Sequence, residues 1–249
     1  MDLANRVAIV TGASRGIGEQ ISLALAFRGV KMALVARNGD KLQIVADQIQ
    51  SRGGHAAVFP CDITNAGEVD AMVVRVLALY GKIDILVNSA FWGPPARIED
   101  TTEELWDKTL DTTLKGSFLC AHAVTPIFKE NGGGRIINIG SIAGKFGENN
   151  RTAYCAAKFG LEGLSAALTS ELTRYNIHVH LITPAATYTP WWIEAGTILT
   201  EKTIARMIPP EVIAETVCWV ISQPDQVHIP DVPVYNFLDP FEGSDSPVR

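Results

Sequence analysis

The segment that decides the fold is Val7-Ala8-Ile9-Val10-Thr11-Gly12-Ala13-Ser14-Arg15-Gly16-Ile17-Gly18. Its first four residues form a short apolar run that predicts a buried strand, and a helical pattern follows over residues 16–28. The glycines between them permit a tight turn, and the free N–H groups at the start of the helix favour a bound phosphate. The spacing Gly-x-x-x-Gly-x-Gly differs from the commoner Gly-x-Gly-x-x-Gly, but its place between a strand and a helix predicts a dinucleotide-binding turn.

Strands and helices alternate along the rest of the chain. Expected strands span residues 6–10, 31–36, 56–59, 83–87, 134–139, 177–182 and 232–237. Expected helices lie near residues 16–28, 40–51, 66–80, 102–129, 152–175 and 210–222. This alternation predicts a single α/β domain over residues 1–249, a Rossmann-type doubly wound parallel sheet of about seven strands with helices on both faces. The irregular region 184–210 follows the sixth strand and predicts a substrate loop.

Composition and charge exclude several classes of function. The chain has 249 residues, of which 47% are hydrophobic and 19% are charged, as in folded globular proteins. A formal net charge of −6 and the lack of a long basic run argue against a nucleic-acid partner. No apolar stretch approaches the roughly 20 residues of a membrane helix, and the first strand begins too early to leave room for a signal peptide. We therefore expect neither nucleic-acid nor membrane binding.

The cysteines and histidines show no spacing typical of a metal site. The cysteines are Cys61, Cys120, Cys155 and Cys218, and the histidines are His55, His122, His178, His180 and His228. Buried thiols in a reducing compartment explain the cysteines, which favours a cytoplasmic protein. We expect no metal ion.

Three polar residues in the second half of the chain form a candidate catalytic group. Tyr154 and Lys158 lie four residues apart, about one helical turn, and Ser141 lies thirteen residues upstream. A phenol and an ammonium on one helix face allow the ammonium to lower the pKa of the phenol. Tyr154 could then protonate a carbonyl oxygen while a hydride reaches the carbon, with Ser141 donating to the same oxygen. If each residue is considered alone, the tyrosine could be part of the core, the lysine could be solvated and the serine could cap a turn.

Taken together, these motifs resemble the classical short-chain dehydrogenase/reductase family over nearly the whole chain. The matching features are the turn at residues 11–18, Asp62-Ile63, Asn88-Ser89-Ala90, Ser141 and Tyr154…Lys158. The resemblance implies that Tyr154 is the general acid/base, that Ser141 polarises the substrate carbonyl, and that Lys158 also holds the nicotinamide ribose. The combination is specific for the family and leaves the substrate open.

The resemblance also implies a set of cofactor-binding residues. These are Gly12, Ser14, Arg15, Gly16, Ile17, Gly18, Arg37, Asp62, Ile63, Asn88, Ala90, Tyr154, Lys158, Pro184, Thr187 and Thr189. Within this set, Asp62 would accept from the adenine amine, Ile63 would pack on the adenine ring, and Thr187 and Thr189 would contact the nicotinamide carboxamide. Asp62 could alternatively cap the helix that follows it.

Two arginines bear on the choice of cofactor. NAD-selective relatives carry an acidic residue at the end of the second strand, where Ala36 stands in this chain. Ala36 would not repel a 2′-phosphate, and Arg37 and Arg15 could pair with it. We therefore expect NADP(H) in preference to NAD(H), the alternative being that both arginines are merely solvated.

Several positions depart from the family pattern. Relatives have asparagine where Thr113 stands, and that asparagine helps to hold a water that relays protons to the lysine. Thr113 is accordingly included among the catalytic residues, although its side chain is shorter than that of asparagine. Phe91 replaces a glycine near the cofactor, and Ala185 replaces the glycine of a Pro-Gly pair.

These features predict an NADP(H)-dependent carbonyl reductase/alcohol dehydrogenase acting on a small carbonyl or secondary alcohol. The tryptophans at 191 and 192, with Phe91, suggest an apolar part in the substrate, although such tryptophans also serve interfaces. Alternatives are a catalytically weak NADP(H)-binding protein with a regulatory or structural role, and another reaction on the same scaffold. We expect a homodimer or homotetramer, because relatives associate through the helices at residues 102–129 and 152–175. A leucine stripe on the second helix, at 161, 164, 168 and 172, could serve this purpose or face the sheet.

Overall fold

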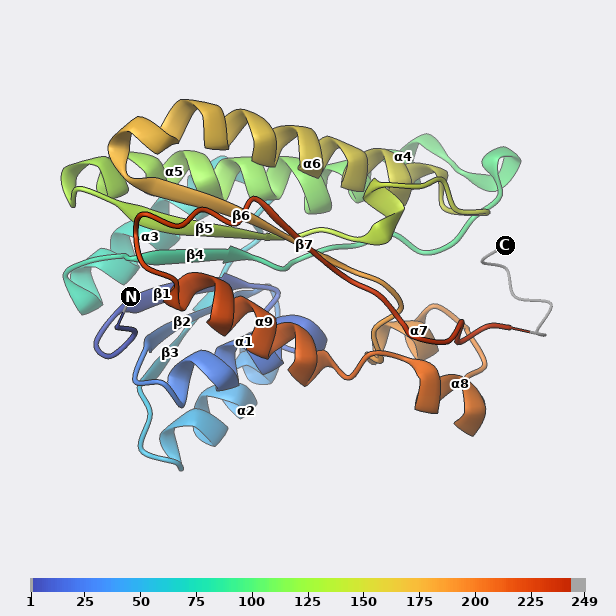
Figure 1. Ribbon diagram of the computed structural model, residues 1–249, viewed down its shortest axis with the longest axis horizontal. Coiled ribbons are helices and arrows are strands. Elements are labelled where there is room, and N and C mark those ends of the chain that lie inside the picture. The colour runs from blue at the N-terminus through green and yellow to red at the C-terminus, as the bar shows by residue number, and fades with distance from the viewer. Residues whose placement is uncertain (1, 243–249) are drawn as a thin grey trace.

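The computed structural model describes residues 2–242, in which seven parallel strands form one sheet (Figure 1). The strands are β1 (Val7–Thr11), β2 (Lys31–Ala36), β3 (Ala56–Pro60), β4 (Ile85–Asn88), β5 (Gly134–Ile139), β6 (Ile177–Pro184) and β7 (Asp231–Val234). Their order across the sheet is β3-β2-β1-β4-β5-β6-β7. The predicted doubly wound sheet is therefore confirmed. The order reverses between β1 and β4, where such sheets bind ligands at their carboxyl ends.

Helices cover both faces of the sheet (Figure 1). One face carries α1 (Gly16–Ala26), α2 (Gly39–Gln50) and α9 (Pro210–Ser222), whose apolar residues share one buried core. The other face carries α3 (Ala66–Tyr80), α5 (Gly116–Glu130) and α6 (Thr152–Leu172) over a second core. The central strands are buried on both sides, which explains why their sequences are nearly continuous apolar runs.

Polar side chains define where several helices begin. Asn38 caps α2, Asn65 caps α3, and Thr102 caps α4 (Glu103–Leu110), each by accepting a hydrogen bond from a first-turn N–H. Because Asn65 caps α3, Asp62 is free of that role. None of the helices within residues 2–242 combines the length and the apolar character needed to cross a membrane.

The helix predicted over residues 102–129 is interrupted. Its two parts, α4 and α5, are joined by a π-helical turn over Asp111–Lys115. Gly116 follows this turn and packs directly against the side chain of Ile63. A Cβ at position 116 would lie 2.6 Å from Ile63 Cδ1. Apolar periodicity does not distinguish a π-turn from an α-turn, and such turns often mark functional sites.

Two other expectations need correction. The irregular region 184–210 contains two short helices, α7 (Trp191–Glu194) and α8 (Glu201–Arg206), the second capped by Thr200. The last strand ends at Val234, not at residue 237.

The leucine stripe of α6 faces the sheet, since Leu161 and Leu172 are buried and Leu168 packs against the core.

Candidate active site

A cavity of about 1600 Å³ opens at the carboxyl ends of the strands. The predicted site residues that line it are Gly12, Ser14, Arg15, Gly16, Ile17, Gly18, Arg37, Asp62, Ile63, Ala90, Ser141, Tyr154, Lys158, Pro184, Thr187 and Thr189. Two predicted residues, Asn88 and Thr113, are buried outside the lining. The fold thus brings the glycine-rich turn and the Ser-Tyr-Lys group to one cavity, although they are far apart in sequence.

The turn between β1 and α1 can be built only with glycine at its key positions. Gly12 has φ 67°, and a Cβ there would lie 2.8 Å from the Cα of Ala90. A Cβ on Gly18 would lie 2.3 Å from the carbonyl oxygen of Gly12. The compact turn leaves the N-terminus of α1 at the cavity, where its free N–H groups and partial positive charge fit the pyrophosphate of a dinucleotide.

The hydroxyl of Thr11 holds the neighbouring turn in place. Thr11 Oγ1 accepts hydrogen bonds from the N–H of Ser89 at 3.1 Å and of Ala90 at 3.2 Å. The segment after β4 is thereby tied to the end of β1, next to Gly12. The sequence placed Thr11 at the start of the glycine-rich turn but did not indicate this role, because the bond joins it to a segment 78 positions away.

Cationic and acidic residues line the end of the cavity near β2 and β3. Arg37 and Lys41 are exposed there beside Ala36. Asp62 accepts hydrogen bonds from the N–H and hydroxyl of Thr64, at 3.0 and 2.9 Å. Burial raises the pKa of Asp62, but these hydrogen bonds and the nearby charge of Arg37 outweigh burial and lower it. Asp62 is therefore held ionised in a fixed orientation, and Lys41 is a cation that sequence reasoning missed.

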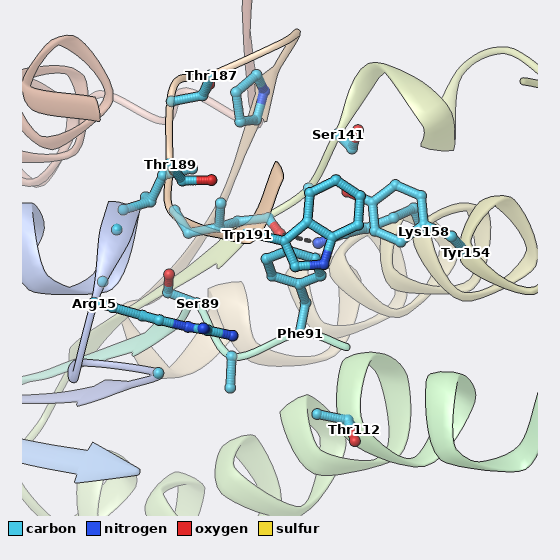
Figure 2. A pocket seen from close by; sticks show the side chains of 18 of the residues that line it. Arg15, Ser89, Phe91, Thr112, Ser141, Tyr154, Lys158, Thr187, Thr189 and Trp191 are labelled. Atoms are coloured by element: carbon cyan, nitrogen blue, oxygen red, sulfur yellow. Dashed lines mark hydrogen bonds between the residues drawn. The ribbon is translucent and has the colours of Figure 1, made fainter. Parts of the chain in front are cut away.

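Arg15 has a partner of its own. Its guanidinium forms an ion pair with Glu194 on α7, so that the glycine-rich turn is linked to the region 184–210. In Figure 2, Arg15 lies on the opposite side of the pocket from Tyr154, Lys158 and Ser141. Sequence reasoning treated Arg15 as free for a 2′-phosphate, because a contact with a residue 179 positions away cannot be read locally.

Ser141, Tyr154 and Lys158 meet as the helical spacing predicted. Tyr154 and Lys158 are both buried on α6, and Ser141 follows β5. Ser141 lies close enough to Tyr154 to lower the pKa of the phenol. Lys158 Nζ donates to the carbonyl oxygen of Ile139 at 2.6 Å. The three groups therefore lie around one end of the cavity (Figure 2).

The electrostatics of Tyr154 differ from the expectation. Burial raises the pKa of Tyr154, and this exceeds the lowering by the charge of Arg151 and by the nearby Ser141 hydroxyl. Burial, together with repulsion from Arg151, lowers the pKa of Lys158 to about 7. The net shift of the phenol pKa is thus opposite to the expected lowering. Lys158 Nζ donates to Ile139 and lies 5.7 Å from the centroid of the Tyr154 ring, whereas the Arg151 guanidinium lies 4.3 Å from it. The phenol stays protonated at neutral pH, as a proton donor must be.

Asn88 supports the sheet from beneath the cavity. Its Nδ2 donates to Asn138 Oδ1 at 2.9 Å and to the carbonyl oxygen of Ser117 at 3.3 Å. Asn138 in turn donates to Ser165 Oγ at 2.8 Å. These buried bonds connect β4, β5, α5 and α6, so Asn88 acts on the site by fixing the elements around it.

Thr113 does not reach the cavity. It is fully buried in the π-turn, where Oγ1 donates to the carbonyl oxygen of Trp92 at 3.3 Å and accepts from its N–H at 3.4 Å. The carbonyl oxygen of Thr113 accepts from the hydroxyl of Ser117 at 2.8 Å. Its side chain thus holds the segment that carries Phe91, and the structure does not place its hydroxyl where it could relay protons to Lys158.

Thr113→Val should accordingly lower thermal stability more than turnover. Valine keeps the shape but leaves the N–H and C=O of Trp92 without this partner, a loss of about 1–3 kcal/mol, or several degrees in Tm. Melting curves and kcat are measured for Thr113→Val and for Thr112→Val, a neighbour that lines the cavity. A large fall in kcat at unchanged Tm would instead restore the relay role.

An aromatic cluster and a buried arginine complete the site. The ring of Phe91 lies 5.9 Å from that of Tyr154 and 5.6 Å from that of Trp191, measured between centroids. Figure 2 shows Trp191 and Phe91 in the middle of the pocket, between Arg15 and Tyr154. Arg151 also lines the cavity and is buried. Arg151 precedes the first residue of α6 and pairs with Ala96 in an isolated β-bridge, a contact that the sequence does not indicate.

The second tryptophan of this region is structural. Trp192 is buried, and its indole N–H donates to the carbonyl oxygen of Thr187 at 2.8 Å. It supports the backbone beside the cavity, whereas Trp191 is the one that meets Phe91.

Three of the five histidines lie together, although they are dispersed in sequence. The rings of His178, His180 and His228 are 5.6 to 6.1 Å apart, outside the lining of the cavity. The Nδ1–H of His180 donates to the carbonyl oxygen of Ile229, and burial lowers the pKa of His180 to about 4. Over residues 2–242, no group of three or more His, Cys, Asp or Glu side chains could hold a metal ion.

Known proteins are similar to this chain in sequence and in structure. The model of the short chain dehydrogenase family matches residues 6–197. A protein of Thauera aromatica named (2S)-[(R)-hydroxy(phenyl)methyl]succinyl-CoA dehydrogenase subunit BbsD is 34% identical over 225 residues, 88% of this chain and 90% of that protein. A metagenomic short-chain oxidoreductase in complex with NADP has a TM-score of 0.83 at 33% identity, covering 96% of this chain and 100% of its own. A variant of the actinorhodin polyketide ketoreductase with NADPH has a TM-score of 0.86 at 31% identity, covering 93% of this chain and 96% of its own.

Proposed function

The chain belongs to the short-chain dehydrogenase/reductase family of NAD(P)-dependent oxidoreductases, and we propose that it transfers a hydride between NADP(H) and a carbonyl or secondary alcohol. The observation that carries the proposal is the convergence of Ser141, Tyr154 and Lys158 in the same cavity as the glycine-rich turn. The turn can seat a pyrophosphate, and the Ser-Tyr pair can receive a carbonyl oxygen. The cavity volume of about 1600 Å³ is large enough for a dinucleotide and a small substrate together.

The side chains divide the work at the substrate oxygen. Tyr154, kept protonated by its raised pKa, donates its proton to that oxygen. Ser141 donates a second hydrogen bond and stabilises the charge that develops there. The bound cofactor supplies the hydride chemistry. Lys158, with a pKa of about 7, can hold ribose hydroxyls and accept or release a proton near neutral pH.

The preference for NADP(H) rests on charge at the end of β2. Ala36 presents no carboxylate, while Arg37 and Lys41 line the cavity beside it. These cations can pair with a 2′-phosphate, whereas Arg15 is engaged by Glu194. Two structural neighbours, described with NADP and with NADPH, support the same choice.

Turnover of a broad panel of ketones, aldehydes and secondary alcohols with NADPH and with NADH tests the proposal. We expect activity, and faster activity with the phosphorylated cofactor. Tight NADPH binding without turnover of any substrate would favour the alternative of a cofactor-binding protein with a regulatory or structural role. The complete Ser-Tyr-Lys group supports an enzyme.

We also propose that the protein is a cytoplasmic homodimer or homotetramer. Phe118 on α5 and Phe159 on α6 are about half exposed, at 47% and 48%, and could pack against a second copy. Light scattering that gives a strict monomer at micromolar concentration would overturn the assembly. Four free cysteines support a reducing compartment.

A further inference from the structure

Arg151 is a buried cation that makes no side-chain hydrogen bond within residues 2–242. It is 6% exposed, it lines the cavity, and its Nε is buried with no acceptor. Within the part of the chain that the structure describes, no group accepts a hydrogen bond from its guanidinium. Buried arginines are normally paired, because an uncompensated charge away from water is costly. The guanidinium is therefore positioned for a ligand that residues 2–242 do not supply.

Aromatic rings hold the guanidinium in the substrate half of the cavity. Its Cζ lies 4.3 Å from the centroid of the Tyr154 ring and 4.8 Å from that of Trp191. Contact with two rings limits the movement of the guanidinium and leaves its N–H groups for an acceptor. One small substrate could therefore contact both the Arg151 guanidinium and the Tyr154 hydroxyl.

The nearest carboxylate does not satisfy Arg151. Glu148 Oε2 lies 4.0 Å from Arg151 Nε, too far for a hydrogen bond. Burial raises the pKa of Glu148, although the charge of Arg151 opposes this. Glu103, Glu104 and Asp107 also line the cavity, but they are exposed on α4, where solvent screens their charge.

We propose that Arg151 binds a carboxylate of the substrate, so that the enzyme interconverts short oxo acids and hydroxy acids in preference to neutral ketones and alcohols. The inference rests on the proposed function, whose substrate class it specifies. In the reducing direction the carbonyl carbon gains a hydride from NADPH and the oxygen gains the proton of Tyr154, giving a hydroxy acid and NADP⁺. The carboxylate stays intact and accepts hydrogen bonds from the Arg151 guanidinium, whose planar fork matches it.

Matched acid and ester substrates test this assignment. Pyruvate, acetoacetate and levulinate place the carboxylate progressively further from the carbonyl, and each is compared with its methyl ester. The ratio of kcat/KM for acid over ester is measured for the wild type, Arg151→Met, Arg151→Lys and Arg97→Met. Arg97 is a nearby arginine whose side chain is 71% exposed, and it serves as the matched control.

We expect the wild type to favour at least one acid over its ester by about 10- to 100-fold, the value of hydrogen bonds to charged groups. The ratio should fall to about one in Arg151→Met, stay intermediate in Arg151→Lys, and be unchanged in Arg97→Met. Equal use of acid and ester by the wild type, or a preference that survives Arg151→Met, would overturn the inference. Using the ratio separates recognition of the anion from any effect of Arg151 on the Tyr154 pKa.

A binding measurement gives an answer that does not depend on turnover. With NADP⁺ present, a bound acid raises Tm according to its affinity. The acid should stabilise the wild type more than the ester does, and Arg151→Met should abolish that difference. If acids bind through Arg151 but no substrate is turned over, the proposed function fails and the carboxylate site stands. If esters and neutral ketones are reduced and acids have no advantage, the site fails and the proposed function stands.

Discussion

Tyr154→Phe is expected to lower kcat by about 10²–10⁴-fold while the cofactor still binds, because general acid/base groups contribute about that much. Only the hydroxyl is removed, and with it the proton for the substrate oxygen. The ring is retained, so its packing against Phe91 and the guanidinium of Arg151 persists. The Ser141 hydroxyl accepts from the N–H of Ala143 at 3.2 Å, and this bond holds its orientation when the phenol hydroxyl is removed.

The measurement is kcat with saturating NADPH, together with the Kd for NADPH from fluorescence and Tm as a folding control. Tyr188→Phe is the matched variant, since Tyr188 is 40% exposed and lies outside the cavity lining. It should behave as the wild type. If Tyr154→Phe kept more than about a tenth of the wild-type kcat, the acid role of Tyr154 would be wrong.

The second large effect concerns cofactor choice. Ala36→Asp combined with Arg37→Gln is expected to change the ratio of NADPH to NADH affinity by about 10²–10³-fold, from NADPH toward NADH. A carboxylate at position 36 would repel a 2′-phosphate, and the lost guanidinium would no longer pair with it. Ala36 ends β2 next to the cavity and is partly exposed, so the new carboxylate is not forced into the core.

Dissociation constants for both cofactors decide the matter, measured for the wild type, each single variant and the double variant. Arg37→Gln alone should weaken NADPH with little effect on NADH. Ala36→Asp should add the repulsion and also offer the ribose hydroxyls an acceptor. If the wild type bound NADH more tightly than NADPH, the proposed preference for NADP(H) would be wrong. Residual preference for NADPH in the double variant would point to Lys41 as a further phosphate partner.

Several parts of the site were predictable because they depend on local sequence. Gly12 and Gly18 have no room for a side chain, and this requirement appears in the sequence as glycine at a fixed spacing. Tyr154 and Lys158 share a helix face because one turn of helix separates them, whatever the rest of the fold does. Ser141 was located only by its resemblance to a family motif, since a serine after a strand has no pattern of its own.

Other features could not be predicted because they depend on distant parts of the chain. The pKa of Tyr154 follows from how deeply α6 is buried, which reversed the expected shift. Arg15 pairs with Glu194, and Thr113 bonds to Trp92, through contacts that only the packing of the loops creates. The guanidinium of Arg151 lies between Tyr154 and Trp191 for the same reason.

The sequence by itself therefore determined the order of strands and helices, the family, the glycine-rich turn and the identity of the Ser-Tyr-Lys group. Each of these is encoded by side-chain periodicity, backbone freedom or the spacing of residues within one element. Only the tertiary structure decided which charges are buried, which hydroxyls are already occupied and which cation lies beside Tyr154 in the cavity. These properties depend on desolvation and on distances between segments far apart in the chain, and a one-dimensional pattern contains neither.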